Sequence, residues 1–232
     1  MLRHKKVQVV LGKGLASEWN DDHIVNFATR IDWVEDFMIN ALADNWDDAD
    51  ETSGTATDIS FDSGFVAVRL NATGGAGNIS TIARNVLAAQ ANFTNDDAQP
   101  LVEFAIDVDA PTADNQTHEF GLFDEATAPF TANQDGCFFR IDNNVLWAVS
   151  SDGAAETKTN LGAPDQFAVY AVKHTAVADF FYVDDLETAK ATHAANISSS
   201  DLTIKLTCAQ RAGGSNKLNC QAVCFSGLRQ TS

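Results

Sequence analysis

The stretch HEFGLFDEATAPFTANQDGCFFRIDNNVLWAVSSDG, residues 118–153, is made of short segments in which apolar and polar residues alternate. A period of two residues is typical of a strand with one buried face. The segments CFFRID and VLWAVSS are separated by Asn143 and Asn144, which tolerate the positive φ angles of a tight hairpin turn. The stretch therefore predicts a strand, a loop, a second strand, a turn and a third strand.

The same alternation recurs along most of the chain. In LVEFAIDVDA, residues 101–110, four apolar residues at even positions alternate with Glu103, Ala105, Asp107 and Asp109. Similar segments lie at 63–72, 166–174, 202–210 and 217–227. Many short strands separated by turn signals predict an all-β, antiparallel two-sheet sandwich. The core expected from this pattern includes Val102, Phe104, Ile106, Phe120, Leu122, Phe139, Trp147, Val169 and Val183.

Composition excludes several classes of protein. The chain has 232 residues and a net charge of −17, which argues against a nucleic acid as a direct partner because phosphates would be repelled. No apolar run approaches the roughly 18 residues of a membrane span, so we expect no membrane insertion. The N-terminal VQVVLG is too short and too polar for the core of a signal peptide, so we expect no secretion by the usual route.

The four cysteines are Cys137, Cys208, Cys220 and Cys224. They lack the spacing of a zinc site, and we expect four free, reduced thiols. Cys220 and Cys224 are four residues apart and would share one face of a strand. Free thiols fit synthesis in a cytoplasm.

The acidic strand at 101–110 is a candidate for a glycosidase site. Jelly-roll glucanases typically place three acids at alternate positions of one strand, but Ala105 occupies the middle position here. Glu103 and Asp107 are four residues apart, about 13 Å along a strand, whereas a retaining glycosidase needs about 5–5.5 Å between its carboxyl groups. His118 and Glu119 have no serine or cysteine nucleophile motif beside them in sequence. We therefore expect no catalytic residues, no enzymatic activity and no cofactor.

Two further groups of residues are candidates for binding. Trp33 and Trp46 lie beside acidic residues and could stack on a sugar, whereas Trp147 lies in a strand pattern. The segment DNWDDADE lacks the regular spacing and the glycine of an EF-hand loop, so a solvated loop is expected and calcium is only an alternative. Its calcium candidates are Asp44, Asp47, Asp48 and Asp50.

A boundary near residue 30 divides the chain into an N-terminal basic arm, residues 1–30, and a sandwich, residues 31–232. The arm combines basic residues with the segment VQVVL, which can add a strand to an exposed sheet edge. We expect this arm to contact a partner protein. The residues expected to make the contact are Arg3, Lys5, Lys6, Val7, Val9 and Lys13.

Several motifs carry a resemblance to a known family. Phe120-Gly121, Asp135-Gly136, the run 138–140 and the run FYVD at 181–184 occur in the order and spacing of one domain type. With WVEDFM at 33–38, they make residues 31–232 resemble the concanavalin A-like jelly-roll domains of tailed-bacteriophage virion proteins. Asp185 stands where glycine is usual in this pattern.

The resemblance implies a structural protein of the virion, synthesised in the host cytoplasm. The function it favours is a capsid decoration or cement protein that binds the shell through its N-terminal arm or its sandwich surface. Such a protein would form a homo-oligomer and contact the major capsid protein and other virion proteins. The alternative is a carbohydrate-binding, host-recognition module of a head or tail spike, with a glycan as partner. A glycoside hydrolase is the third reading.

Overall fold

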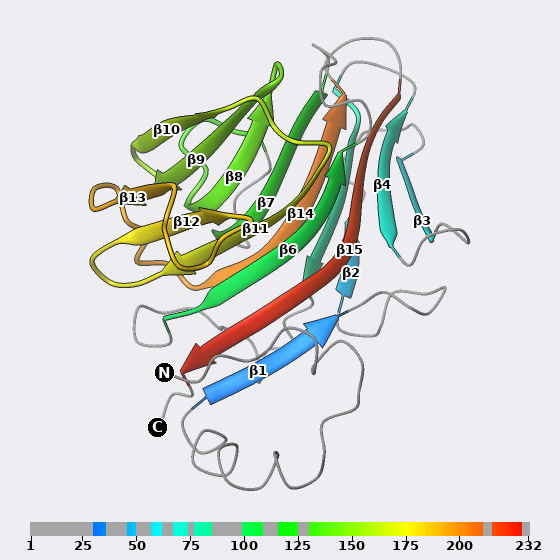
Figure 1. The fold of residues 1–232 in the computed structure, drawn as a ribbon. Coiled ribbons are helices and arrows are strands. Elements are labelled where there is room, and N and C mark those ends of the chain that lie inside the picture. Colours follow the sequence, from blue (N-terminus) through cyan, green and yellow to red (C-terminus); the bar gives the residue numbers. More distant parts are fainter. Residues whose placement is uncertain are drawn as a thin grey trace, which may run out of the picture.

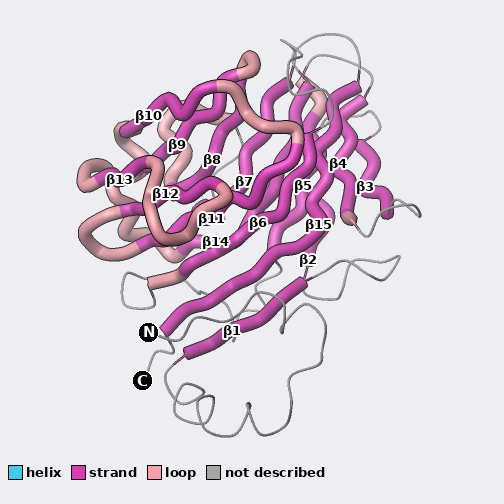
Figure 2. The backbone as a smooth tube through the Cα atoms, in the orientation of Figure 1, coloured by secondary structure: helices cyan, strands magenta, loops and turns pink. Residues whose placement is uncertain are grey.

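The computed structural model describes residues 30–35, 46–49, 57–61, 67–73, 77–84, 99–108, 116–124, 130–210 and 215–228. Every regular element in these ranges is a β-strand (Figure 2). Among the described residues, no helical segment has the length and hydropathy of a membrane span. The predicted all-β class is confirmed.

The strands form two antiparallel sheets that pack face to face, with β6 and β15 in front of β7 and β14 in Figure 1. Sheet A has the order β13-β12-β11-β6-β15-β4-β3, and β1 also pairs with β15. Its strands are β1 (Arg30–Glu35), β3 (Thr57–Phe61), β4 (Val68–Thr73), β6 (Leu101–Val108), β11 (Phe167–His174), β12 (Asp179–Val183), β13 (Ala191–His193) and β15 (Ser215–Leu228).

Sheet B has the order β10-β9-β8-β7-β14-β5-β2. Its strands are β2 (Trp46–Ala49), β5 (Ile79–Arg84), β7 (Gln116–Asp124), β8 (Gly136–Asp142), β9 (Val145–Ser151), β10 (Glu156–Gly162) and β14 (Leu202–Gln210). Neighbouring strands in each sheet are often distant in sequence, as in β7 beside β14 and β6 beside β15. The predicted jelly-roll sandwich is confirmed. The order of strands in each sheet differs from their order in the sequence because of these crossovers.

The main core lies between the sheets and is rich in aromatic rings. Phe120 of sheet B meets Phe104 and Tyr170 of sheet A with ring centroids 5.7 Å and 5.0 Å apart. Phe139 also contacts Tyr170, and Phe181 from β12. Such edge-to-face pairs stabilise a core beyond the area they bury, by about 0.5–1.5 kcal/mol each. Of the predicted core residues, the six from Val102 to Phe139 are fully buried, and Val183 packs at the edge.

Two predicted core residues are placed differently. Trp147 is partly exposed and packs against a separate cluster of Phe123, Phe138 and Val149 on the outer face of sheet B. Val169 is also only partly buried, because its neighbours Ala168 and Tyr170 take the core side of β11. Both predictions were wrong, since alternation alone does not say which face of a strand is inside.

The last strand contains an irregularity that separates two cysteines. The register of β15 against β6 shifts between Cys220 and Ala222. Cys220 lies opposite the core residue Ile106 and is fully buried, whereas Cys224 lies opposite Glu103 and is partly exposed. The extra residue of a bulge reverses the alternation, so the prediction that Cys220 and Cys224 share a face was wrong. All four cysteines are free, as predicted.

The turns at the centre of the chain follow from residue type. Asn143 and Asn144 have φ angles of 48° and 60°, as predicted for the tight turn between β8 and β9. Gly121 in β7 has φ 156°, and a Cβ there would lie 2.6 Å from Cα of Phe138. Glycine is therefore needed where β7 and β8 approach closely, beside the outer face of sheet B.

Candidate functional site

The outer face of sheet B carries a transverse row of polar and aromatic side chains. Cross-strand pairing aligns Glu119 of β7 with Arg140 of β8, Arg140 with Trp147 of β9, and Trp147 with Asn160 of β10. On the far side of Glu119, its partner is Thr207 of β14. We call these five residues the outer row. The row crosses the strands at right angles to their length, because cross-strand partners lie side by side.

Arg140 holds two carboxylates on this face. Its Nε lies 2.6 Å from Oε1 of Glu119, and its Nη1 lies 3.3 Å from Oε1 of Glu156 on β10. Lys158 adds a contact of 3.3 Å to the other oxygen of Glu156. The guanidinium group also stands over the ring of Phe138, 5.2 Å from its centroid. The planar guanidinium can bind carboxylates along two edges at once, which orders the whole group.

The side chains of this network become more exposed from Glu119 outward to Lys158. The side chain of Glu119 is fully buried, those of Arg140 and Glu156 are 15% and 11% exposed, and that of Lys158 is 46% exposed. Burial raises the pKa of the Glu119 carboxyl, and the charge and hydrogen bond of Arg140 oppose that effect. Burial by itself would lower the pKa of Arg140, but the two carboxylates outweigh it and raise that pKa.

The segment 130–135, which precedes β8, contacts Glu119 through the backbone of Phe130. The backbone N–H of Phe130 donates to Oε2 of Glu119 over 3.1 Å and also lies 3.0 Å from Oε1 of Gln134. Phe130 has a φ of 57°, an uncommon value for a bulky side chain. Asn133 donates to the carbonyl of Ala154 over 2.7 Å and links this segment to the loop before β10. Glu119 thus accepts hydrogen bonds from Arg140 at one carboxylate oxygen and from the backbone of Phe130 at the other.

The arm, calcium and sugar-stacking candidates named from the sequence are not members of the outer row. The arm residues Arg3, Lys5, Lys6, Val7, Val9 and Lys13 lie outside the described residues, as do Asp44 and Asp50. Asp47 and Asp48 lie within β2, where a loop was expected. Trp33 lies in β1 opposite Phe225. Trp46 is 4% exposed and belongs to the main core, whereas the sequence made it a candidate for sugar stacking.

The structure places the acidic residues of β6 on an outer face and His118 in the interior. Glu103 and Asp107 lie on the outer face of β6, because Val102, Phe104 and their even-numbered neighbours fill the core. His118 is fully buried on β7, and burial lowers the pKa of its imidazole to about 3. It is therefore neutral at physiological pH and is not a proton shuttle at the surface.

Sequence reasoning missed Arg140, Glu156 and the position of Trp147. Glu119 was noticed, but its partner Arg140 is 21 residues further on and Glu156 a further 16. A usable signal was present in the three strands 116–124, 136–142 and 145–151. Once they pair in sequence order, Glu119, Arg140 and Trp147 fall into one row.

Comparisons with solved structures agree with this architecture. A native glycosidic hydrolase matches with a TM-score of 0.60 at 13% identity, covering 84% of this chain and 94% of that one. A β-glucanase of Bacillus licheniformis matches with a TM-score of 0.56 at 16% identity, covering 84% and 97%. The carbohydrate recognition domain of Emp46p, in a metal-free form, matches with a TM-score of 0.55 at 10% identity, covering 78% and 87%. No family model and no curated protein matches the sequence.

These matches show the concanavalin A-like jelly-roll fold, and they correct one expectation. The prediction that the protein is not an enzyme is contradicted, because similar structures include a glycosidic hydrolase, two β-glucanases and a lichenase. The similar structures thus include glycoside hydrolases and a carbohydrate recognition domain. They give no support to the virion part of the resemblance, and the virion location and capsid partners stay predictions.

Proposed function

We propose that the protein binds a glycan chain on the outer face of sheet B, along the outer row. The observation that carries the proposal is the alignment of a partly exposed Trp147 with Arg140, which is fixed between Glu119 and Glu156. An aromatic ring offers an apolar surface to the C–H face of a sugar. Fixed charged groups beside it offer hydrogen bonds to hydroxyl groups. Binding sites commonly combine an aromatic surface with a few oriented polar groups.

The proposed site is preorganised. Arg140 contacts both carboxylates, and the Phe138 ring lies beneath its guanidinium. Side chains that are already ordered lose little conformational entropy when a ligand binds. Asn160 and Lys158 at the exposed edge of β10 extend the polar surface outward. A chain lying along the exposed part of the row would meet the amide of Asn160, the ring of Trp147 and the guanidinium of Arg140 in succession.

A neutral glycan fits this face better than a polyanionic one. Glu119 and Glu156 balance the charges of Arg140 and Lys158, so the site has little net charge of its own. The whole protein has a net charge of −17 and repels anions at long range. We therefore expect β-glucan-type oligosaccharides to bind more tightly than uronic acid polymers.

Isothermal titration calorimetry with neutral and anionic oligosaccharides tests the proposal. Trp147→Ala should weaken the binding of a neutral oligosaccharide by at least tenfold. Phe167→Ala is a matched control, because Phe167 is 52% exposed on β11 of the other sheet and should leave binding unchanged. If the wild type and Trp147→Ala are both folded and bind the oligosaccharide equally, the glycan binds elsewhere. If neither binds any oligosaccharide, the proposal is wrong.

A second candidate function is hydrolysis of the bound glycan, favoured by the environment of Glu119. Glycosidases use two carboxyl groups, one of which holds a proton because its pKa is raised. Burial raises the pKa of Glu119, and Glu156 is bound to the same guanidinium group. Glu119 is fully buried, so this function requires its surroundings, including its bond to Phe130, to open before a substrate reaches it.

Release of reducing sugars from neutral β-glucans tests this second function. Glu119→Gln and Glu156→Gln should each abolish turnover, whereas Glu103→Gln on the opposite sheet should not. Turnover that survives both substitutions would rule out this pair. Binding without any turnover in the wild type would leave the first function as the only one of the two.

A further inference from the structure

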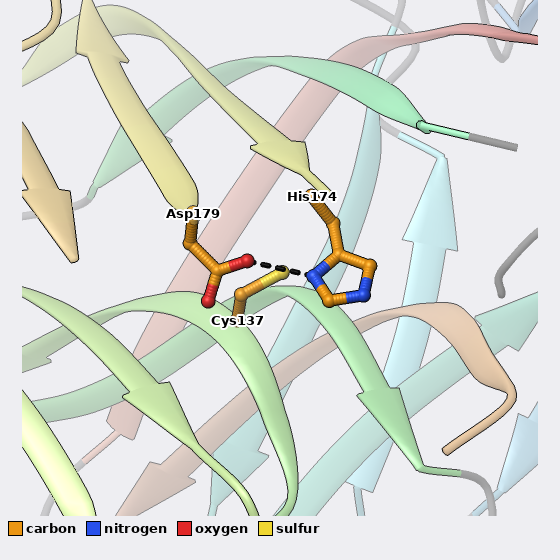
Figure 3. A group of neighbouring side chains, drawn as sticks. All are labelled: Cys137, His174 and Asp179. Atoms are coloured by element: carbon orange, nitrogen blue, oxygen red, sulfur yellow. Dashed lines mark hydrogen bonds and ion pairs between the residues drawn. The ribbon is translucent and has the colours of Figure 1, made fainter. Parts of the chain in front are cut away.

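A second polar cluster lies inside the sandwich, away from the outer row. Cys137 of β8, His174 at the end of β11 and Asp179 at the start of β12 point toward one another (Figure 3). All three are fully buried, and one ligand atom from each lies within 4.8 Å of the others. The imidazole Nδ1 of His174 is 2.7 Å from Oδ1 of Asp179.

The fold brings these residues together by pairing and stacking. His174 and Asp179 are cross-strand partners in sheet A. In the turn between them, the Thr175 hydroxyl donates a hydrogen bond to the carbonyl of Ala178 and accepts one from the N–H of Ala178. Asp179 in turn pairs with His193 of β13. Cys137 comes from the core-facing side of sheet B. His193 bridges the sheets by contacts to Ser150 and Thr159.

The cluster is not arranged for nucleophilic catalysis by cysteine. Burial raises the pKa of the Cys137 thiol, and the nearby charge of Asp179 raises it further. In Figure 3 the ring nitrogen that faces the thiol is the same nitrogen that bonds to Asp179. In a catalytic triad, the two ring nitrogens serve the nucleophile and the acid separately. Full burial also closes the thiol to any substrate.

The donor set suits a metal ion. Thiolate, imidazole and carboxylate are the three side-chain ligands of Zn²⁺. Asp179 is a fully buried carboxyl group whose Oδ2 has no hydrogen-bond partner among the described residues. A buried carboxylate is costly unless it is paired or coordinates a metal. The charge of a divalent ion would equal the sum of one thiolate and one carboxylate, so the complex would be neutral in the low-dielectric core.

We propose that Cys137, His174 and Asp179 form a buried site for one divalent transition-metal ion of the zinc type. Binding releases the thiol proton of Cys137 and leaves the ring proton of His174 on Nε2, so that Nδ1 is free to bind the ion. The hydrogen bond between Nδ1 of His174 and Oδ1 of Asp179 is thereby replaced with two metal–ligand bonds. Tetrahedral Zn²⁺ would hold that nitrogen and oxygen about 3.3 Å apart, so the two side chains must separate by about 0.6 Å. Three protein ligands leave the fourth position to water. Because the site is closed, the ion enters while the chain folds.

Refolding with a metal ion tests the proposal. The full chain is unfolded in urea with a chelator, freed of both, and refolded with Co²⁺ or Zn²⁺. Wild-type protein should retain about one ion per chain by elemental analysis. The Co²⁺ form should show a thiolate-to-cobalt absorption band, and the Zn²⁺ form should unfold at a higher temperature than protein refolded in chelator.

Variants separate this site from accidental binding. Cys137→Ser should remove the cobalt–thiolate band, and Asp179→Asn should lower metal retention at least tenfold. Cys208→Ser is the matched control, because Cys208 is equally buried on β14 of the same sheet but outside the cluster. If wild-type protein refolds without retaining an ion, or if Cys208→Ser loses the band as fully as Cys137→Ser, the proposal fails. The wild-type measurement decides the question even if a variant does not fold.

Discussion

Replacing Arg140 by methionine should destabilise the fold because it strands a buried charge. The Glu119 side chain is fully buried, and its shortest ionic contact is the one of 2.6 Å to Arg140. Without the guanidinium, Glu119 keeps the N–H of Phe130 but loses its counter-charge. Breaking a buried pair by removing one partner costs about 3–5 kcal/mol. The free energy of unfolding at pH 7 should fall by about that amount.

The double variant Glu119→Gln/Arg140→Met is the matched control. Replacing both members of a buried ion pair is often nearly neutral, so we expect this variant to lose only about 1–2 kcal/mol. The two substitutions should therefore couple by at least about 2 kcal/mol in a double-mutant cycle. Urea unfolding followed by tryptophan fluorescence gives all four free energies.

The loss of unfolding free energy caused by Arg140→Met should also depend on pH. The Glu119 carboxyl has a pKa raised above its ordinary 4.5, so its effect on stability is most favourable below that value. As the pH rises through the raised pKa, the folded state must ionise a buried group and stability falls. Loss of Arg140 strengthens this trend, so the variant should approach the wild type in acid. Additive free energies in the cycle, or a penalty independent of pH, would refute this reasoning.

Other predictions concern the rest of the fold. Gly121→Ala should cost about 1–3 kcal/mol in urea unfolding, because φ is 156° and the new Cβ would lie 2.6 Å from Cα of Phe138. Phe104→Ala should cost about 3–5 kcal/mol in urea unfolding, since its ring is fully buried against Phe120. Burial raises the pKa of the Cys208 thiol to about 12, so mass spectrometry should find it unalkylated at pH 8 in folded protein and alkylated in urea.

The strands and their turns could be predicted from the sequence because their causes are local. Alternation at 101–108 follows from the two faces of a strand, and the structure shows that burial pattern. The turn at Asn143 and Asn144 was recognisable because few residue types adopt positive φ. The all-β class therefore needed only short windows of sequence.

The inside and outside of each strand could not be assigned in this way. In VLWAVSS the largest apolar residue, Trp147, lies on the outer face with Val149, and the core side takes Leu146, Ala148 and Ser150. A bulge in β15 likewise places Cys220 and Cys224 on opposite faces, contrary to their spacing. The face that is buried depends on what the partner sheet presents, and a short window does not contain that information.

Both candidate sites are products of tertiary structure. Glu119, Arg140 and Glu156 lie on three strands and meet only because β7, β8, β9 and β10 pair in order. Cys137 meets His174 and Asp179 only because the two sheets stack. The sequence by itself determined strands, turns and class, since these depend on neighbours within a few residues. The tertiary structure decided which side chains share a face or a core, because contacts between distant residues depend on the order and register of whole strands.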